Sequence, residues 1–568
     1  MKRFFFLAAV ALLPGFTLAQ VLEWAKSFGG TGSDLGASIA VDGEGNVYTI
    51  GAFQGTVDVD PGAATFNLTA AGESDVFIVK SNASGNFVWA RALGGTSKDQ
   101  AYSLALDGSG NVYLTGGFQG TADFDPGAGV LQLTSSGSYD FFIAKLTTGG
   151  NLVWAKAMGG AFRDFGYFID VDAAGNVYTT GEYAGTVDMD PGSGSFNLTS
   201  VGTSDVFVSK LDASGNFVWA KSMGGVNEFT VAYGLALDDA GNVYTSGKFQ
   251  GTGDFDPGAG VFSLTSAGDN DVFITKLDNN GNFVWAKSMG GALSDVSSYV
   301  AVDGSGNVYT TGVFRGTSDF NPGAGVFNLF AGGDGGIFLS KLDANGNFVW
   351  AKVMAGTVYG FGFALALDEA GNVFTTGYFE GTFDFDPGAG TFNLTPAGLY
   401  DVFISKIDAG GNLLWAKSIG GTEDELCYSI AVDAAGSIYA TGEFRGTVDF
   451  DPDAATFDLT SGGGADVFVL KMSNPKTSRD QLADVFALTI APNPSTGRFV
   501  VESGAQSLLP LHLGVYNSLG QEVLPSREIA PAPQWVEEID LGGQPDGIYH
   551  LRISDGKRSL SRKLVVHR

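Results

Sequence analysis

Three observations predict an all-β protein, a seven-bladed β-propeller followed by a small β-sandwich. A short apolar strand, Asn86-Phe-Val-Trp-Ala-Arg91, recurs seven times at spacings of 65 or 66 residues. A second strand, Asp75-Val-Phe-Ile-Val-Lys80, recurs with the same spacing, and the repeat is lost beyond residue 488. Repeats of this length, built from β-forming residues, are typical of propeller blades. The tryptophans that mark the repeat are Trp24, Trp89, Trp154, Trp219, Trp285, Trp350 and Trp415.

Length and charge narrow the class of protein. A chain of 568 residues is too long to fold around one simple hydrophobic core, so several domains or a repeat array are expected. Residues 20–474 hold 51 acidic and 19 basic side chains, whereas residues 475–568 hold ten of each. This acidic excess excludes a general nucleic-acid binder, which needs a basic face.

Cysteine and histidine usage excludes several kinds of site. Cys427 is the single cysteine, so the chain has no disulfide framework. The three histidines, His512, His550 and His567, all lie beyond the repeats. The repeat region therefore cannot form a Ser-His-Asp or Cys-His site, or a zinc site of the usual kinds.

Residues 1–19 have the pattern of a secretory signal peptide. Lys2 and Arg3 precede a ten-residue apolar run that is too short to cross a bilayer. Small residues at Thr17 and Ala19 predict cleavage before Gln20. We therefore expect an exported product without a transmembrane segment.

The repeats occupy residues 20–472, and each unit is predicted to form one four-stranded blade. The strands are apolar on both sides, as expected for a sheet enclosed between two neighbouring sheets. Asp and Gly residues mark a tight turn after the first strand and another after the third. The tryptophan of the fourth strand is expected to pack between blades. In one unit the four strands are expected at 102–107, 111–115, 140–145 and 151–156, and the longer insert at 120–133 lies between the second and third strands.

The two ends of the repeat region are out of phase. The chain enters on a fourth strand, Val21 to Ser27, and leaves on a third strand, Asp466 to Lys471. Pairing of these segments would complete the last blade and remove two exposed strand edges. We therefore expect the N-terminal strand to close the ring.

Two motifs of the repeat resemble a known family. They are the Asp-Val-Phe-Ile-x-Lys-Leu-Asp-x-x-Gly-Asn strand pair and the Ala-Val-Asp-x-x-Gly-Asn-Val-Tyr-x-Thr-Gly hairpin. They resemble the bacterial β-propeller repeats of the SBBP type. The resemblance implies the fold, and it implies little about chemistry.

Residues 473–487 are predicted to be a linker, and residues 488–568 a small β-sandwich with alternating strands. The segments Ala491-Pro-Asn-Pro-Ser-Thr-Gly497, Val515-Tyr-Asn-Ser-Leu-Gly520 and Pro545-Asp-Gly-Ile-Tyr549 resemble the type A C-terminal sorting domain of the type IX secretion system. The resemblance implies that this domain engages the secretion machinery for passage across a Gram-negative outer membrane. It also implies removal of the tail, after which the cargo is released or attached to surface lipopolysaccharide.

A pair of acidic residues recurs in the insert and has three interpretations. Side chains two apart on a strand share a face, so both carboxylates can converge on one Ca²⁺ ion. Alternatively, each Asp caps the turn through local hydrogen bonds, or the pair acts as catalytic carboxylates. One unit has Asp319 and Asn321 instead. The other pairs are Asp58 and Asp60, Asp123 and Asp125, Asp188 and Asp190, Asp254 and Asp256, Asp384 and Asp386, and Asp449 and Asp451.

The loops that contain Gly-Gly vary between units and should lie on the same face as the inserts. Variable loops on a rigid scaffold are common binding sites. The repeat is most irregular between residues 321 and 361, where Tyr359 and Phe361 are found. We therefore expect a ligand patch at these two aromatic residues.

Together these features predict a secreted or surface-attached, non-enzymatic propeller that serves as a binding or adhesion scaffold. Polysaccharide, a surface protein and calcium are the candidate ligands, and no other cofactor is expected. An enzyme acting on extracellular polysaccharide through carboxylates is one alternative. A structural component of a surface layer is the other.

Overall fold

A computed structural model describes residues 20–226, 229–474, 488–503, 511–530, 535–554 and 559–568, which form two compact units, 1–474 and 475–568. The predicted signal peptide and most of the predicted linker lie outside the described residues. Every regular element in the described ranges is a strand, so the predicted all-β class is confirmed.

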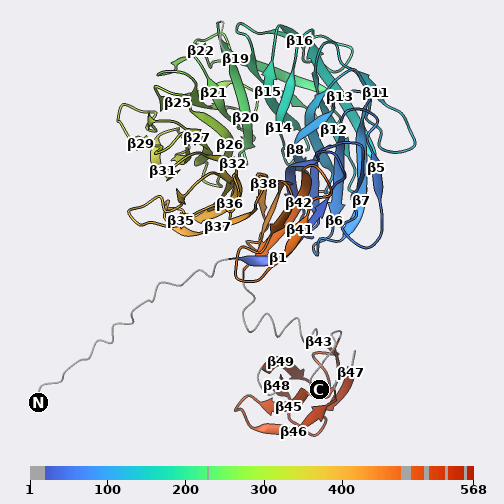
Figure 1. Ribbon diagram of the computed structural model, residues 1–568. Helices are drawn as coiled ribbons and strands as arrows, with labels where there is room; N and C mark the ends of the chain where they lie inside the picture. The colour runs from blue at the N-terminus through green and yellow to red at the C-terminus, as the bar shows by residue number, and fades with distance from the viewer. Residues whose placement is uncertain (1–19, 227–228, 475–487, 504–510, 531–534, 555–558) are drawn as a thin grey trace, which may run out of the picture. The chain divides into compact units, whose positions relative to one another are not determined.

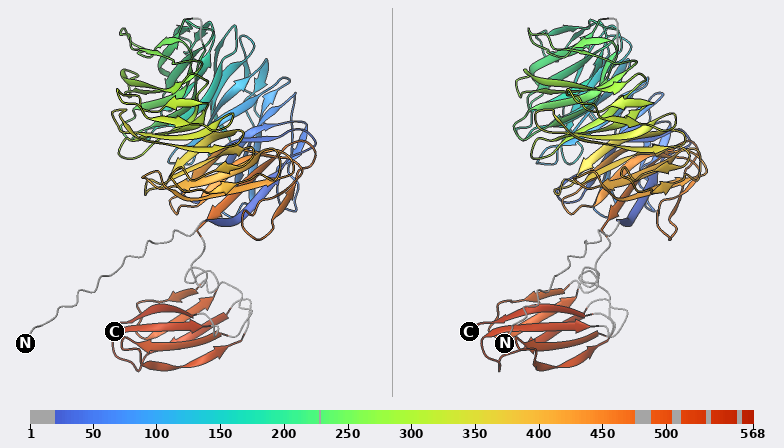
Figure 2. Two further views of the ribbon diagram at one scale, coloured as in Figure 1. Left: turned by 60° about the vertical axis from the view of Figure 1, so that its left-hand side comes forward. Right: turned by 90° about the vertical axis from the view of Figure 1, so that its left-hand side faces the viewer.

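The first unit is a closed ring of sheets around a central channel (Figures 1 and 2). In its described residues it contains six six-stranded sheets, one four-stranded sheet and one two-stranded sheet. The first strand of each repeat lies nearest the channel and contacts the first strand of the next repeat, and the last of them, β38, contacts the first, β2. These inner strands are β2 (Leu35–Val41), β8 (Gln100–Leu106), β14 (Phe165–Val171), β20 (Thr230–Leu237), β26 (Val296–Val302), β32 (Gly360–Leu367) and β38 (Glu425–Val432).

The remaining strands of each repeat follow outward in antiparallel order. The second strands are almost fully buried, which explains their apolar character on both faces. They are β3 (Val47–Phe53), β9 (Val112–Phe118), β15 (Val177–Tyr183), β21 (Val243–Phe249), β27 (Val308–Phe314), β33 (Val373–Phe379) and β39 (Ile438–Phe444). The third strands are β6 (Asp75–Ser81), β12 (Asp140–Leu146), β18 (Asp205–Leu211), β24 (Asp271–Leu277), β30 (Gly336–Leu342), β36 (Asp401–Ile407) and β42 (Asp466–Ser473). The fourth strands are β1 (Val21–Phe28), β7 (Phe87–Gly95), β13 (Leu152–Gly160), β19 (Phe217–Gly225), β25 (Phe283–Gly291), β31 (Phe348–Gly356) and β37 (Leu413–Gly421).

The N-terminal strand closes the ring as predicted. β1 pairs antiparallel with β42, from Val21 opposite Ser473 to Phe28 opposite Val467. An ion pair of 3.1 Å between Lys471 Nζ and Glu23 Oε2 spans the same junction. The last sheet is therefore built from both ends of the repeat region.

The insert lies outside the four predicted strands of each repeat, and it forms a two-stranded hairpin that in six of the seven repeats joins the preceding sheet. In the second repeat, Asp123 and Ala122 of β10 pair with Gly94 and Gly95 of β7. A Cβ atom on Gly95 would lie 2.1 Å from the Thr121 carbonyl oxygen, so the Gly-Gly sequence permits this close approach. The hairpins are β4 (Thr56–Asp58) with β5 (Asn67–Thr69), β10 (Thr121–Asp123) with β11 (Gln132–Thr134), β16 (Thr186–Asp188) with β17 (Asn197–Thr199), β22 (Thr252–Asp254) with β23 (Ser263–Thr265), β28 (Thr317–Asp319) with β29 (Asn328–Phe330), β34 (Phe383–Asp384) with β35 (Asn393–Leu394), and β40 (Thr447–Asp449) with β41 (Asp458–Thr460).

The tryptophan of the fourth strand links neighbouring sheets through a hydrogen bond. Trp24 Nε1 donates a hydrogen bond to the Ala83 carbonyl oxygen (3.2 Å), and Trp154 Nε1 donates to that of Ala213 (3.2 Å). In both cases the acceptor lies in a turn of the next repeat, 59 residues further on. The apolar indole ring packs between the sheets while its one polar atom, Nε1, has a hydrogen-bond acceptor. This confirms the expected packing role of the tryptophan.

The second unit is a small β-sandwich. One sheet has the order β43-β44-β47, and the other has the order β46-β45-β48-β49. Phe499, Leu513 and Leu551 are among the buried residues of their common core. The strands are β43 (Leu488–Ala491), β44 (Arg498–Ser503), β45 (Leu511–Asn517), β46 (Glu522–Ile529), β47 (Trp535–Asp540), β48 (Gly547–Ser554) and β49 (Ser559–Val566).

Candidate binding site in the central channel

A β-bulge in every inner strand shapes the channel. In β8 the register to β9 shifts between Ala101 and Ser103, so Tyr102 has no partner residue on β9. The same shift recurs at the equivalent position of the other inner strands. Bulges redirect a side chain away from the regular alternation of a strand. The seven unpaired residues are Ala37, Tyr102, Tyr167, Tyr233, Ser298, Phe363 and Tyr428.

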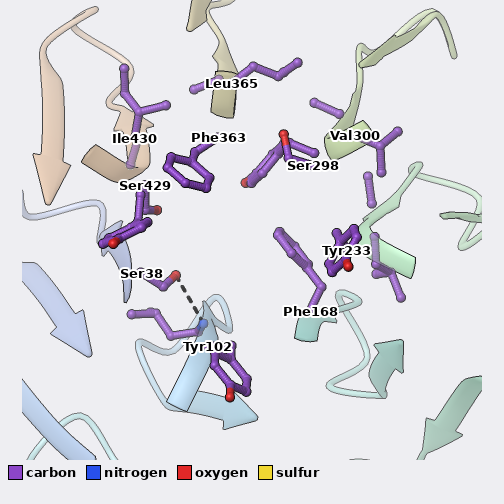
Figure 3. Close-up of a pocket in the computed structure, with 18 of the residues that line it drawn as sticks. Ser38, Tyr102, Phe168, Tyr233, Ser298, Val300, Phe363, Leu365, Ser429 and Ile430 are labelled. Carbon is purple, nitrogen blue, oxygen red and sulfur yellow. Dashed lines mark hydrogen bonds between the residues drawn. The ribbon is translucent and has the colours of Figure 1, made fainter. Parts of the chain in front are cut away.

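All seven of these residues line one cavity of about 950 Å³ at the centre of the ring. Figure 3 shows Tyr102, Tyr233, Ser298 and Phe363 around its open middle. We call the seven residues the collar. Five members of the collar are aromatic, whereas Ala37 and Ser298 are small.

The aromatic residues of the collar form two arcs. In the first arc, Tyr102 lies 5.4 Å from Tyr167, and Tyr167 lies 5.4 Å from Tyr233, measured between ring centroids. In the second arc, Phe363 lies 5.0 Å from Tyr428. The small residues Ala37 and Ser298 separate the arcs, so two aromatic walls flank a gap. Such faces can stack against flat or apolar ligand groups.

Polar side chains orient the tyrosine hydroxyl groups of the collar. Tyr102 donates to Gln100 Oε1 and Tyr167 donates to Glu182 Oε1, each over 3.0 Å. Burial raises the pKa of Tyr102 and of Tyr233 to about 12, so both phenols stay protonated near neutral pH. The collar therefore combines apolar ring faces with fixed hydrogen-bonding groups.

One repeat differs from the others deeper in the channel. Asp170 of β14 lines the cavity, whereas the equivalent position is alanine in the other six inner strands. Phe168 and Tyr299 also line the cavity, and their ring centroids lie 5.1 Å apart in an edge-to-face arrangement. Lys248, the one cation of the lining, lies over the Tyr233 ring of the collar, 6.0 Å from its centroid. The channel is thus chemically asymmetric despite its repeated backbone. The six alanines are Ala40, Ala105, Ala236, Ala301, Ala366 and Ala431.

The predicted Asp-x-Asp pairs lie in the insert hairpins, and none of them lines the cavity. Asp123 Oδ1 accepts hydrogen bonds from the backbone N–H groups of Asp125 (3.0 Å) and Leu131 (2.9 Å). Asp125 Oδ1 in turn accepts one from the N–H of Gly127 (2.8 Å). This geometry is that of turn capping, the second of the three interpretations.

The other hairpins repeat this geometry. The first Asp of each pair accepts hydrogen bonds from the N–H groups two and eight residues further on, and the second accepts one from the N–H two residues further on. The first residues are Asp58, Asp188, Asp254, Asp384 and Asp449. The second residues are Asp60, Asp190, Asp256, Asp386 and Asp451. In the remaining hairpin, Asn321 Oδ1 takes the place of the second carboxylate.

The metal-binding interpretation of these pairs stays a prediction beside this hydrogen bonding. Among the residues that the structure describes, no group of three or more His, Cys, Asp or Glu side chains is placed to hold a metal ion. The carboxylates face the backbone amides of their own hairpins because those amides would otherwise lack acceptors. Calcium binding stays a prediction. The residues of this prediction are Asp58, Asp60, Asp123, Asp125, Asp188, Asp190, Asp254, Asp256, Asp384, Asp386, Asp449 and Asp451.

The two predicted patch residues both lie beside the collar. Phe361 lines the cavity, and its ring centroid is 4.7 Å from that of Phe363. Tyr359 lies behind it, 6.1 Å from Tyr378 and beneath the Arg315 guanidinium. Both residues therefore extend the second aromatic arc.

The sequence reasoning missed the collar and a set of buried acids where neighbouring sheets meet. Alignment of the repeats would have shown the collar as one position occupied by five aromatic residues. The acids come in pairs, such as Asp75 at the start of β6 and Asp99 in the next Gly-Gly loop, which are 4% and 1% exposed. Asp99 accepts hydrogen bonds from the N–H groups of Gly95 and Gln119, whereas Asp75 Oδ1 has no partner among the described atoms. Burial, with a contribution from the Asp75 charge, raises the pKa of Asp99 to about 6.

Comparison with protein families identifies both parts of the chain. Residues 489–567 match the secretion system C-terminal sorting domain, and residues 23–52 and 88–116 match the β-propeller repeat called SBBP. Both resemblances seen in the sequence are therefore confirmed. The sorting domain implies export and a location at the cell surface or in the medium. No helix able to cross a membrane is found in the described part of the chain.

Individual relatives are distant. An uncharacterized WD repeat-containing protein, L264, of Acanthamoeba polyphaga mimivirus is 24% identical over 509 residues, which cover 76% of this chain and 36% of the relative. The regulatory protein FlaEY of Caulobacter vibrioides is 29% identical over 142 residues, 25% of this chain and 14% of the relative. The matches thus cover little more than a third of the first relative and a smaller part of the second. The solved structure of YCF48 bound to D1 peptide has a TM-score of 0.36 and 10% identity, and covers 82% of this chain and 98% of its own.

Proposed function

We propose that this protein is a non-enzymatic binding or adhesion scaffold that is displayed at or released from the cell surface, and that its ligand enters the collar. One observation carries the proposal: the unpaired residues of the inner strands, five of them aromatic, meet around one cavity of about 950 Å³. A concave site lined by aromatic residues with a few oriented polar groups is typical of ligand recognition. A surface protein or a polysaccharide is the class of ligand that such a site can receive.

The arrangement of carboxylates favours binding over hydrolysis. A glycosidase needs two carboxyl groups on opposite sides of the scissile bond. One carboxylate, that of Asp170, lines the cavity. The Asp-x-Asp carboxylates accept hydrogen bonds from backbone amides in their own hairpins. The polysaccharide-degrading enzyme therefore stays the weaker alternative.

Export supplies the setting for this function. We propose that residues 488–568 engage the type IX secretion machinery, and that tail removal leaves the propeller free or attached to surface lipopolysaccharide. The family match to the sorting domain supports this route. The same route would place the propeller outside a Gram-negative outer membrane, where a surface protein or polysaccharide is accessible.

Retention of surface material on the immobilised full-length chain tests the proposal. We expect surface proteins or glycans to be retained by the natural protein and lost with the double variant Tyr167→Ala/Tyr428→Ala, which removes one ring from each arc. Loss of one aromatic anchor typically costs about 1–3 kcal/mol, or roughly 5- to 150-fold in affinity. Val130→Ala, at an exposed hairpin tip (70% exposed), is the matched control.

Two results would contradict the proposal. Equal retention by the double variant would place the ligand elsewhere on the protein. Self-association of the pure protein without retention of any ligand would favour the surface-layer alternative.

A further inference from the structure

The interior of the channel changes character with depth. Two positions after the collar residue, each of the seven inner strands contributes one aliphatic residue to the cavity lining, and each residue of this aliphatic layer is 1–7% exposed, so that only a small part of it reaches the cavity. Figure 3 shows Val300, Leu365 and Ile430 of this layer. A methylene chain matches such a lining, whereas a polyhydroxylated sugar ring would lose hydration there without compensation. The layer consists of Ile39, Leu104, Ile169, Leu235, Val300, Leu365 and Ile430.

Asp170 is the one carboxylate of this interior. It is half-buried, and its Oδ1 accepts a hydrogen bond from the Val171 N–H at 2.8 Å. The Leu237 N–H, on the next inner strand, is its second donor. A carboxylate offers about four acceptor positions, so these two donors leave capacity for a further partner.

The immediate surroundings of Asp170 contain aromatic rings and lack a compensating cation. Burial and the Asp172 charge raise the pKa of Asp170 to about 6, whereas its two backbone donors lower it; no cation contributes among the described residues. Burial and the charge of Asp170 also raise the pKa of Tyr299, which packs edge-to-face with Phe168. A carboxylate beside aromatic rings is the combination that attracts an ammonium group.

We propose that the channel binds a primary ammonium group on an unbranched aliphatic stem, as in a lysine side chain of a protein partner, with the ammonium at Asp170. The stem packs against the aliphatic layer, and the collar encloses the peptide segment that carries it. The acidic excess of the repeat region, 51 acidic against 19 basic side chains, favours the approach of a cationic partner. This inference deepens the proposed function and rests on it, because it names the chemistry of the ligand for the same channel.

Binding of small probes to the full-length chain tests the inference. The probes are n-hexylammonium, its neutral analogue 1-hexanol, the anion hexanoate and glucosamine, each titrated at about pH 7.5, where an acid of the stated pKa is ionised. Affinities are measured by calorimetry or by ligand-observed NMR. We expect n-hexylammonium to bind about tenfold more tightly than 1-hexanol, in line with one charge-assisted contact, and hexanoate to bind more weakly than either.

Variants of Asp170 test whether its carboxylate causes the preference for n-hexylammonium over 1-hexanol. Asp170→Ala introduces the residue found in the other six inner strands, and Asp170→Asn keeps an oxygen acceptor for the backbone donors. Both variants should bind n-hexylammonium no better than 1-hexanol while their 1-hexanol affinity is unchanged. Asp239→Asn removes an exposed carboxylate from a turn and should leave every affinity unchanged.

Each other outcome has a definite meaning. If 1-hexanol or hexanoate binds as tightly as n-hexylammonium, or if both Asp170 variants retain the preference, the inference is wrong while the proposed channel site stands. If glucosamine binds more tightly than n-hexylammonium, the lysine-like ligand is wrong and an amino sugar replaces it. If no probe binds to the natural protein, this inference is wrong, whereas the channel site of the proposed function is still decided by the retention experiment.

Discussion

The bulged residue of each inner strand determines the character of the channel mouth. Because it has no partner on the second strand, its side chain is free of the alternation that places its neighbours between sheets. Five repeats have an aromatic residue at this position, and the small residues Ala37 and Ser298 separate the two arcs. The same backbone device therefore produces a uniform fold and a non-uniform binding surface.

A second residue with a repeated role is the aspartate of the first turn. Asp107 Oδ1 accepts hydrogen bonds from the backbone N–H groups of Ser109 and Asn111, and its Oδ2 accepts one from the Tyr113 hydroxyl (3.1 Å). Gly110, with φ of 75°, provides the left-handed residue that the turn requires. Burial opposes ionisation of Asp107, but the hydrogen bonds from Asn111 outweigh it and lower its pKa.

We expect Asp107→Ala to destabilise the propeller by about 1–3 kcal/mol, because the largely buried Tyr113 hydroxyl would lose its acceptor. The midpoint of urea denaturation measures the change. Ser109→Ala, on the exposed side of the same turn, is the control and should have little effect. Equal midpoints for Asp107→Ala and the natural protein would show that the turn does not depend on this carboxylate.

At the scale of single elements, the insert hairpins bind adjacent repeats together. Six of the seven hairpins belong to one repeat in sequence but add to the fourth strand of the preceding repeat. The Asp-x-Asp carboxylates hold the turn of the hairpin through its backbone amides. If this capping is their whole role, the hairpins need no ion.

We therefore expect neither added Ca²⁺ nor a chelator to change the melting temperature of the full-length protein. Differential scanning calorimetry with millimolar Ca²⁺ and with EDTA measures this. Asp123→Asn should be a mild change, because one acceptor oxygen remains for the backbone donors. A melting temperature that rises with Ca²⁺, and does so less in Asp123→Asn, would support the calcium interpretation instead.

Buried acids lie at the starts of strands such as β24 and β38, where neighbouring sheets meet, and their pKa values predict how stability depends on pH. Burial, with the Asp295 charge, raises the pKa of Asp271 to about 7, and burial, with the Asp401 charge, raises that of Glu425 to about 8. An acid whose pKa is higher in the folded state than in the unfolded state stabilises the fold at low pH. That contribution is lost as pH rises from the unfolded pKa, near 4, through the folded pKa.

We expect the melting temperature to fall as the pH is raised from about 5 to about 8, the interval in which these folded-state acids ionise. Glu425→Gln and Asp271→Asn should flatten this dependence, because the amides do not ionise. Asp60→Asn is the control, since its carboxylate lies at a hairpin turn away from the junctions. A melting temperature that rises over the same interval would contradict the assignment.

At the scale of the whole molecule, the ring is closed by two segments from opposite ends of the repeat region. β1 completes the last sheet, and its Trp24 also contacts the turn at Ala83 of the next repeat. Without β1, β42 would expose an unpaired edge, and the last sheet would lose its covalent connection to the first sheet, leaving packing contacts such as those of β2 with β38 and β39.

Deletion of residues 21–28 should therefore lower the melting temperature strongly or abolish cooperative unfolding. Circular dichroism during heating and size-exclusion chromatography measure the effect. Removal of residues 475–568, which form the separate second unit, is the control and should leave the melting of the ring unchanged. A deletion variant that melts like the natural protein would show that closure by β1 is dispensable.

Local patterns in the chain were enough to predict the four main strands of each repeat, their order and the closing segment. The spacing of Trp24 and its equivalents, the turn aspartates such as Asp107, and the phase of the two chain ends carried these predictions. Family resemblance added the export route through residues 488–568. All of these features depend on contacts close in sequence or on strict repetition, which a single sequence displays.

Alignment of the repeats would show one position with five aromatic residues, but only the folded ring shows that these side chains meet around one cavity. The bulge that directs Tyr102 into the channel is a shift in pairing between strands, and no residue of β8 indicates it by type. The hairpin of β10 and β11 joins β7 of the preceding repeat, and the carboxylate of Asp170 reaches the next inner strand at Leu237. These juxtapositions arise from closure of the ring, because closure brings equivalent positions that are 65 or 66 residues apart in sequence around one cavity.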